Sequence, residues 1–226
     1  MPESSADLKA RALLIHRRLI DVYGRPEWYP HLDPISEVVN TILSQNTSDV
    51  NRDRAFNRLR ERFSTWEQVR DAAVAEIADA VRPAGLAKQK APRIKAALAF
   101  IHRERGELTL DFLKDSPVPE AKAWLTQIKG IGPKTAAIIL LFSLGMPAFP
   151  VDTHVHRLSQ RLGLITARTT AEKAHDVLEE LLPVDLYYPF HVNLIRHGRE
   201  ICRARRPRCE ICPLNDICHY WQSLAG

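Results

Sequence analysis

Cysteine is scarce in this sequence of 226 residues and is absent from the first 201 positions. All four cysteines, Cys202, Cys209, Cys212 and Cys218, fall within the last 25 residues. A disulfide framework distributed over a secreted fold is excluded by this distribution, because such a framework needs cysteines along the whole chain. We therefore expect these residues to bind a metal centre.

Long apolar runs are also absent. The longest stretch, residues 136–151, is interrupted by Gly145, Pro147 and Pro150, and it is shorter than the roughly 20 residues that a membrane span requires. The N-terminal segment lacks a basic flank followed by an apolar export signal. We expect a cytoplasmic protein with no membrane partner.

Alternation of apolar and polar residues with a period of two, which is typical of strands, is missing as well. Apolar residues instead recur at positions i, i+3, i+4 and i+7, and this pattern predicts an all-α fold. Asp33 and Pro34 suit the N-cap and the first position of a helix. The chain is near the length at which one core splits into two. We expect a central helical domain at 34–148 and a second domain formed by 1–33 plus 149–226.

Charge is only mildly biased. Lysine and arginine total 32 and aspartate and glutamate total 27, which gives a formal net charge of +5. This excess favours a polyanionic partner such as nucleic acid, although many proteins without such a partner carry a similar charge.

The stretch KGIGPKTAA, residues 129–137, is typical of a tight hairpin between two helices. Gly130 and Gly132 tolerate a positive φ, and Pro133 suits the first turn of the second helix. The first amides of that helix are unpaired and lie at the positive end of its dipole, so a phosphate fits there if no Cβ holds it away from the backbone. Taken alone, the motif favours an ordinary glycine turn between two helices over a phosphate site.

The four cysteines have the spacing C-x6-C-x2-C-x5-C, which allows four thiolates to surround one centre. The spacing alone leaves tetrahedral zinc and a 4Fe-4S cluster open. Four arginines, Arg203, Arg205, Arg206 and Arg208, lie between the first two cysteines. Guanidinium groups on a loop held by a metal centre are suited to phosphate contacts.

Asp152 follows Lys134 by eighteen positions, at the start of another predicted helix in VDTHVHR. Taken alone it is explained as an N-cap. The whole segment IKGIGPKTAAIILLFSLGMPAFPVDTHVHRLSQRLGL, however, resembles the helix-hairpin-helix and Gly/Pro-rich segment of DNA glycosylases, and most closely the endonuclease III family. The resemblance extends back to ILSQNTSD and forward through HGREIC to the cysteines.

The resemblance implies specific roles for individual residues. Lys134 and Asp152 match the catalytic lysine and aspartate of the family, and the cysteine spacing matches its 4Fe-4S cluster. Gln45 and Leu86 match residues that fill the gap left by an extruded base, although Leu86 is equally explained as a core residue. His154 and His156 are expected to be structural or to contact phosphate.

The implied activity is that of a bifunctional DNA glycosylase and abasic-site lyase in base-excision repair. We expect it to act as a monomer on double-stranded DNA that carries a damaged base, most often an oxidised pyrimidine, or an abasic site. The resemblance also implies a DNA-binding cleft between the two expected domains and association with the nucleoid. Thr41 and Lys134 argue against adenine excision, since the adenine-excising relatives carry a glutamate at or near position 41 and lack the lysine.

Three alternatives stay open. The first is a monofunctional enzyme that removes thymine or uracil opposite guanine, and the second is a non-catalytic DNA-binding relative. The third is an RNA-binding protein whose cysteine loop is held by a zinc ion, which would need aromatic stacking residues near the basic loop. Tyr220 and Trp221 are the aromatics there, and packing against the metal centre explains them better.

Overall fold

The computed structural model describes residues 4–225, and these residues contain α-helices, short 3-10 turns and one π-helical segment but no strand. The predicted all-α fold is confirmed. Residues 30–146 form one compact unit, and the chain before and after them forms another. None of the helices within the described residues is both long and apolar enough to cross a membrane.

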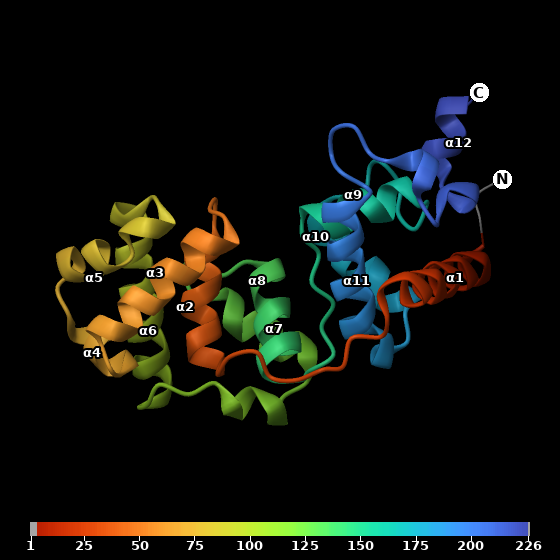
Figure 1. Cartoon of the computed structure of the whole chain (residues 1–226). Coiled ribbons are helices and arrows are strands. Elements are labelled where there is room, and N and C mark those ends of the chain that lie inside the picture. Colours follow the sequence, from red (N-terminus) through yellow and green to blue (C-terminus); the bar gives the residue numbers. More distant parts are fainter. Residues whose placement is uncertain (1–3, 226) are drawn as a thin grey trace. The chain divides into compact units, whose positions relative to one another are not determined.

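The unit formed by residues 30–146 is built around one long helix, α6 (Ala87–Arg105), which packs against α2, α4 and α5 (Figure 1). Its other helices are α2 (Pro34–Ser44), α3 (Asp49–Arg62), α4 (Trp66–Asp71), α5 (Val74–Ala80), α7 (Val118–Thr126) and α8 (Pro133–Ile138), with 3-10 turns at Arg82–Ala84 and Asp111–Asp115. Aliphatic side chains of α2 and α6, among them Val38, Ile42, Ile94 and Leu98, are fully buried and form the core of this unit.

Local sequence explains where α2 begins. The side chain of Asp33 accepts a hydrogen bond from the backbone N–H of Ser36 at 2.9 Å, and Pro34 occupies the first helical position. Both features are favourable at a helix start, because the cap satisfies a free amide and proline has no amide to satisfy. The predicted start of this helix is confirmed.

The apolar run after the hairpin changes its helical type. The α-helix α8 continues as a π-helix over Ile139–Ser143, all of whose side chains are buried. The helix ends before Gly145, which adopts a positive φ of 66°. Periodicity does not distinguish a π-turn from an α-turn within a continuous apolar run, so this feature was not predictable.

The second unit consists of α1 (Ser5–Tyr23), α9 (Thr153–Arg161), α10 (Ala171–Leu181), α11 (Tyr187–Glu200) and α12 (His219–Ala225), with 3-10 turns at Val184–Leu186, Cys209–Ile211 and Asn215–Ile217. Helix α11 packs against both α1 and α9 (Figure 1). A Cβ on Gly198 of α11 would lie 2.9 Å from Nδ1 of His154 in α9. Glycine at this position therefore sets the close approach of α11 to α9.

Candidate functional site

The predicted hairpin lies between α7 and α8. Gly130 has a φ of 98°, which favours glycine, and Ile131 between the two glycines is buried. Gly132, in contrast, is extended at φ −97° and ψ −179° and has open space where a Cβ would stand. The turn thus needs only one glycine for its backbone conformation. Any need for Gly132 has to come from a bound group.

Lys134 is the second residue of α8, directly after the hairpin, and its side chain is exposed. Pro133 occupies the first position, so the lysine belongs to a helix start whose backbone is restrained. An amine in this setting is open to solvent and to any ligand that approaches the hairpin.

Gln45 forms the C-cap of α2, and its side chain extends to the hairpin. Its Nε2 donates a hydrogen bond to the carbonyl oxygen of Gly130 at 3.1 Å, and its Oε1 accepts one from Nη1 of Arg93 at 3.1 Å. The structure thus brings two of the predicted site residues, Gln45 and Gly130, into direct contact. Arg93 is a third member that the sequence did not reveal.

Leu86 precedes the first residue of α6 and has a left-handed backbone with φ 49°. Its side chain is 49% exposed, which rules out the interpretation of this leucine as a core residue. A large apolar side chain held outward on a tight turn is available for contact with a partner.

Lys90 anchors the turn that carries Leu86. Its ammonium group donates hydrogen bonds to the carbonyl oxygens of Leu43 at 2.7 Å and Ala84 at 2.8 Å, and the residue is 1% exposed. Burial lowers the pKa of this ammonium group. Helical periodicity places Lys90 on the same face of α6 as Ile94 and Ala97, so a lysine on an apolar face was the signal that could have identified it.

Asp152 is the N-cap of α9 in the other unit. Its Oδ1 accepts a hydrogen bond from the backbone N–H of Val155 at 2.7 Å. This cap fixes the orientation of the carboxylate at the helix start. The neighbouring His156 contacts the carbonyl oxygen of Thr169 through Nε2 at 2.8 Å, and His154 contacts Arg157, so both rings have structural partners.

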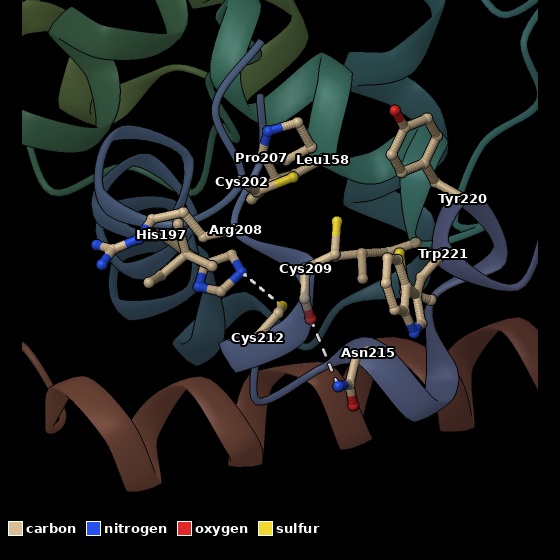
Figure 2. A pocket seen from close by; sticks show the side chains of 13 residues that line it. Leu158, His197, Cys202, Pro207, Arg208, Cys209, Cys212, Asn215, Tyr220 and Trp221 are labelled. Carbon is tan, nitrogen blue, oxygen red and sulfur yellow. Dashed lines mark hydrogen bonds between the residues drawn. The ribbon is translucent and has the colours of Figure 1, made fainter. Parts of the chain in front are cut away.

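The four cysteines lie in the second unit around one pocket, which is also lined by His197, Tyr220 and Trp221. Figure 2 shows Cys202, Cys209 and Cys212 around this pocket. All four are free thiols, with Cys209 and Cys218 buried and the other two half-buried. Burial raises the pKa of Cys212 to about 11 and also raises the pKa of Cys209 and Cys218. Thiolate ligands at this place therefore require a positive centre to displace their protons.

A histidine contacts this set of thiols. Nε2 of His197 lies 3.4 Å from Sγ of Cys212 (Figure 2), and its Nδ1 lies 3.0 Å from the hydroxyl of Tyr23. Burial lowers the pKa of His197 to about 4, so the ring is neutral at pH 7. A ligand thiolate only accepts hydrogen bonds, so the ring donates to it through Nε2 while Nδ1 accepts from Tyr23.

Arg161, at the end of α9, holds the start of the cysteine segment. Its Nη1 donates to the carbonyl oxygen of Arg203 at 2.8 Å and lies 3.3 Å from Sγ of Cys202. Its guanidinium also stacks 4.4 Å from the centre of the Tyr220 ring. No local feature of the sequence indicates this role, because the hydrogen-bond partners lie 41 and 42 positions away. Tyr220 packs within this segment, as expected.

The loop between the first two cysteines presents its charge to solvent. All four of its arginines, Arg203, Arg205, Arg206 and Arg208, are exposed, and none forms an ion pair with another described residue. Helix α1 braces the far end of the segment, where Nη2 of Arg18 donates to Oδ2 of Asp216 at 2.8 Å. A braced loop whose guanidinium groups form no ion pair within the described residues is suited to binding a polyanion.

The donor set fits an iron-sulfur cluster, since four thiols around one pocket with N–H groups directed at sulfur are typical of such centres. Within residues 4–225, no three His, Cys, Asp or Glu side chains are already arranged around one metal-ion position, so the geometry of the thiols alone does not distinguish a zinc ion from a larger cluster. The choice between zinc and iron-sulfur is therefore made by comparison with known proteins.

Two family descriptions match the chain. Residues 39–184 match the HhH-GPD superfamily of base excision DNA repair proteins, and residues 202–218 match the iron-sulfur binding domain of endonuclease III. The second match begins and ends on a cysteine. The cofactor of this chain is thus a 4Fe-4S cluster, and zinc is set aside.

Curated relatives agree with these matches. An endonuclease III from Thermotoga maritima is 34% identical over 197 residues, which cover 87% of this chain and 88% of the relative. A putative DNA repair glycosylase of Methanocaldococcus jannaschii, MJ1434, is 33% identical over 208 residues, covering 90% and 94%. The solved structure of a non-covalent endonuclease III-DNA complex has a TM-score of 0.81 at 24% identity, with 96% of this chain and 98% of that chain covered, which shows the same fold.

Proposed function

Because the chain belongs to the endonuclease III family of HhH-GPD base excision DNA repair glycosylases, we propose that it is a bifunctional enzyme that removes a damaged base and then cleaves the DNA strand. The observation that carries the proposal is the place of Lys134. It is an exposed amine at the second position of α8, directly after the hairpin, and it matches the position of the family's catalytic lysine. A monofunctional glycosylase has no use for a nucleophilic lysine there.

The chemistry assigned to Lys134 is nucleophilic. The neutral amine attacks C1′ of the sugar, the bond from C1′ to the base breaks, and the base leaves with the bonding electrons and takes up a proton. The sugar ring opens to give a Schiff base with the lysine. Loss of a proton from C2′ then expels the 3′ phosphate, and water finally hydrolyses the Schiff base and regenerates the amine.

Asp152 is assigned two electrostatic roles. Its carboxylate stabilises positive charge that develops on the sugar as the base departs, and it assists removal of the proton from the attacking amine. The N-cap hydrogen bond to Val155 supports this assignment, because it holds the carboxylate in one orientation before any substrate binds. Preorganised charge of this kind costs no rearrangement at the moment of reaction.

The remaining predicted residues are assigned to DNA binding. The hairpin glycines receive a backbone phosphate, and the four arginines of the cysteine loop contact further phosphates. Gln45 and Leu86 fill the gap that an extruded nucleotide leaves, a role supported by the exposed side chain of Leu86. When bound, the 4Fe-4S cluster supplies a fixed cross-link among Cys202, Cys209, Cys212 and Cys218, which keeps the arginine loop in shape.

The proposed substrate is double-stranded DNA that carries an oxidised pyrimidine or an abasic site, with the protein acting as a monomer. Thr41 supports excision of a base other than adenine, because Thr41 is buried and its hydroxyl donates a hydrogen bond to the carbonyl oxygen of Val38 in its own helix. The alternative is a monofunctional enzyme for thymine or uracil opposite guanine, which would leave an unbroken abasic site.

Borohydride trapping tests the proposal, because it reduces a Schiff base to a stable amine. The protein is incubated with a duplex that carries one thymine glycol or one abasic site, and covalent protein–DNA bands are compared. We expect a band with wild type and with Lys129→Ala, an exposed lysine on the other side of the same hairpin, but no band with Lys134→Ala. Asp152→Asn should form the band much more slowly.

A wild-type protein that binds the duplex without forming a band would contradict the lyase assignment. Excision without strand cleavage on a guanine–thymine or guanine–uracil mismatch would then establish the monofunctional alternative. Unchanged cleavage by Asp152→Asn would remove the roles assigned to Asp152 alone.

A further inference from the structure

A chain of hydrogen bonds connects helix α6 to the hairpin through Gln45. Nη1 of Arg93 donates to Oε1 of Gln45, and Nε2 of Gln45 donates to the carbonyl oxygen of Gly130, each at 3.1 Å. Arg93 and Gly130 are 48 and 85 positions from Gln45 in the sequence, so tertiary packing alone brings the three residues together.

The partners determine how the Gln45 amide is oriented. A guanidinium group only donates hydrogen bonds and a carbonyl oxygen only accepts them. Turning the amide of Gln45 over would place its NH2 group against Arg93 and its oxygen against the oxygen of Gly130, and both contacts would be lost. Arg93 thus selects one orientation of the side chain and the hairpin reinforces it.

The stem of Arg93 also follows the hairpin turn. A Cβ on Gly130 would lie 3.7 Å from Cδ of Arg93, which is ordinary van der Waals contact. Arg93 is half-buried, so its stem is packed while its guanidinium group reaches Gln45. The positive φ of Gly130 and this packing leave the carbonyl oxygen of Gly130 directed at the amide.

The backbone beneath Gln45 is fixed separately. Lys90, one helical turn before Arg93, donates to the carbonyl oxygen of Leu43 in the last turn of α2 and to that of Ala84 just before the Leu86 turn. These bonds do not involve Arg93. Removal of the Arg93 side chain should therefore free the Gln45 side chain without displacing the end of α2.

We propose that Arg93 is a positioning residue that holds Gln45 in the conformation used for insertion into DNA and couples it to the phosphate-binding hairpin. This inference rests on the proposed role of Gln45. Ordering a glutamine side chain costs conformational entropy, and a side chain that is already ordered avoids that cost when DNA binds. Arg93 thus increases the affinity for DNA in which a nucleotide is extruded or its base is missing more than it increases the affinity for intact DNA.

The test compares binding to two duplexes, one intact and one with a single tetrahydrofuran abasic analogue, for the cluster-containing protein. The variants are Arg93→Met, Gln45→Ala and the double variant. The matched control is Arg103→Met, which removes the same charge from an exposed position of α6 where Arg103 pairs with Glu104. Thermal midpoints verify that all of them are folded.

We expect Arg93→Met to weaken binding to the abasic duplex about tenfold more than binding to the intact duplex, in keeping with the entropy of one glutamine side chain. Arg103→Met should weaken both equally. When Gln45→Ala is already present, adding Arg93→Met should not weaken binding to the abasic duplex more than binding to the intact duplex. A residue that acts only through Gln45 has no such effect once the Gln45 side chain is absent. Arg93→Lys, which keeps one donor, should recover part of the selectivity.

Additive losses in the double variant, equal losses on both duplexes, or stronger selectivity without Arg93 would each overturn the inference. If Gln45→Ala alone leaves the preference for the abasic duplex unchanged, the proposed role of Gln45 fails and the role of Arg93 fails with it. Borohydride trapping at Lys134 is independent of both, so failure of the proposed catalytic function is distinguished from failure of this inference.

Discussion

Replacement of the buried Lys90 by methionine should destabilise the unit formed by residues 30–146. Methionine is an unbranched side chain only one atom shorter than lysine, but it donates no hydrogen bond, so the carbonyl oxygens of Leu43 and Ala84 lose their donor. Hydrogen bonds from a charged group contribute about 1.5–3 kcal/mol each. Burial of the ammonium, which also lowers its pKa, offsets part of this stabilisation. We expect a net loss of about 2–4 kcal/mol.

Thermal unfolding of the cluster-containing protein, followed by circular dichroism, measures this loss. For a chain of this size each kcal/mol lowers the midpoint by about 2–4 °C, so a decrease of about 4–16 °C is expected. Lys88→Met on the same helix is the control, because Lys88 is exposed, and its midpoint should stay near that of wild type. A Lys90→Met protein as stable as wild type would contradict the stabilising role of Lys90, since the two carbonyl groups would then not need a donor.

Three further predictions follow from local geometry. Gly132→Ala should leave stability unchanged, since a Cβ meets open space, but should weaken DNA binding measurably by fluorescence anisotropy if a phosphate approaches that backbone. Gly198→Ala should lower the free energy of unfolding by about 1–3 kcal/mol in urea titrations, because its Cβ would overlap His154. Burial raises the pKa of Glu37, so its contribution to stability is present below the ordinary carboxyl pKa and is lost as pH rises through the folded-state value. Glu37→Gln should therefore be more stable than wild type at pH 7 and show a flatter stability profile between pH 4 and pH 7.

Local signals in the sequence were sufficient to predict the helices and the hairpin. The cap at Asp33, the proline at position 34 and the spacing of apolar residues depend only on neighbours within a few positions. Of the two hairpin glycines that tolerate a positive φ, only Gly130 adopts one, because one left-handed residue is enough to reverse the chain. Composition and spacing of glycines do not reveal which of two adjacent candidates carries the turn.

Contacts across long stretches of sequence could not be predicted. No neighbouring residue indicates the roles of Arg93 and Arg161. Arg93 donates a hydrogen bond to Gln45, 48 positions away, and Arg161 donates one to Cys202, 41 positions away. Lys90 was the exception, since a lysine on the apolar face of a helix indicates a buried partner. The cysteine spacing predicted a shared centre but not its identity, which came from the family resemblance and the later match to the iron-sulfur domain.

Peptide mapping of the borohydride-reduced protein–DNA adduct tests the central claim, that Lys134 is the nucleophile. After nuclease and protease digestion, mass spectrometry locates the lysine that carries the reduced sugar remnant. If Lys134 is the nucleophile, the remnant is found on Lys134 alone, with Lys129 and the N-terminal amine unmodified. A remnant on any other amine, or none on a protein that cleaves the abasic duplex, would contradict it.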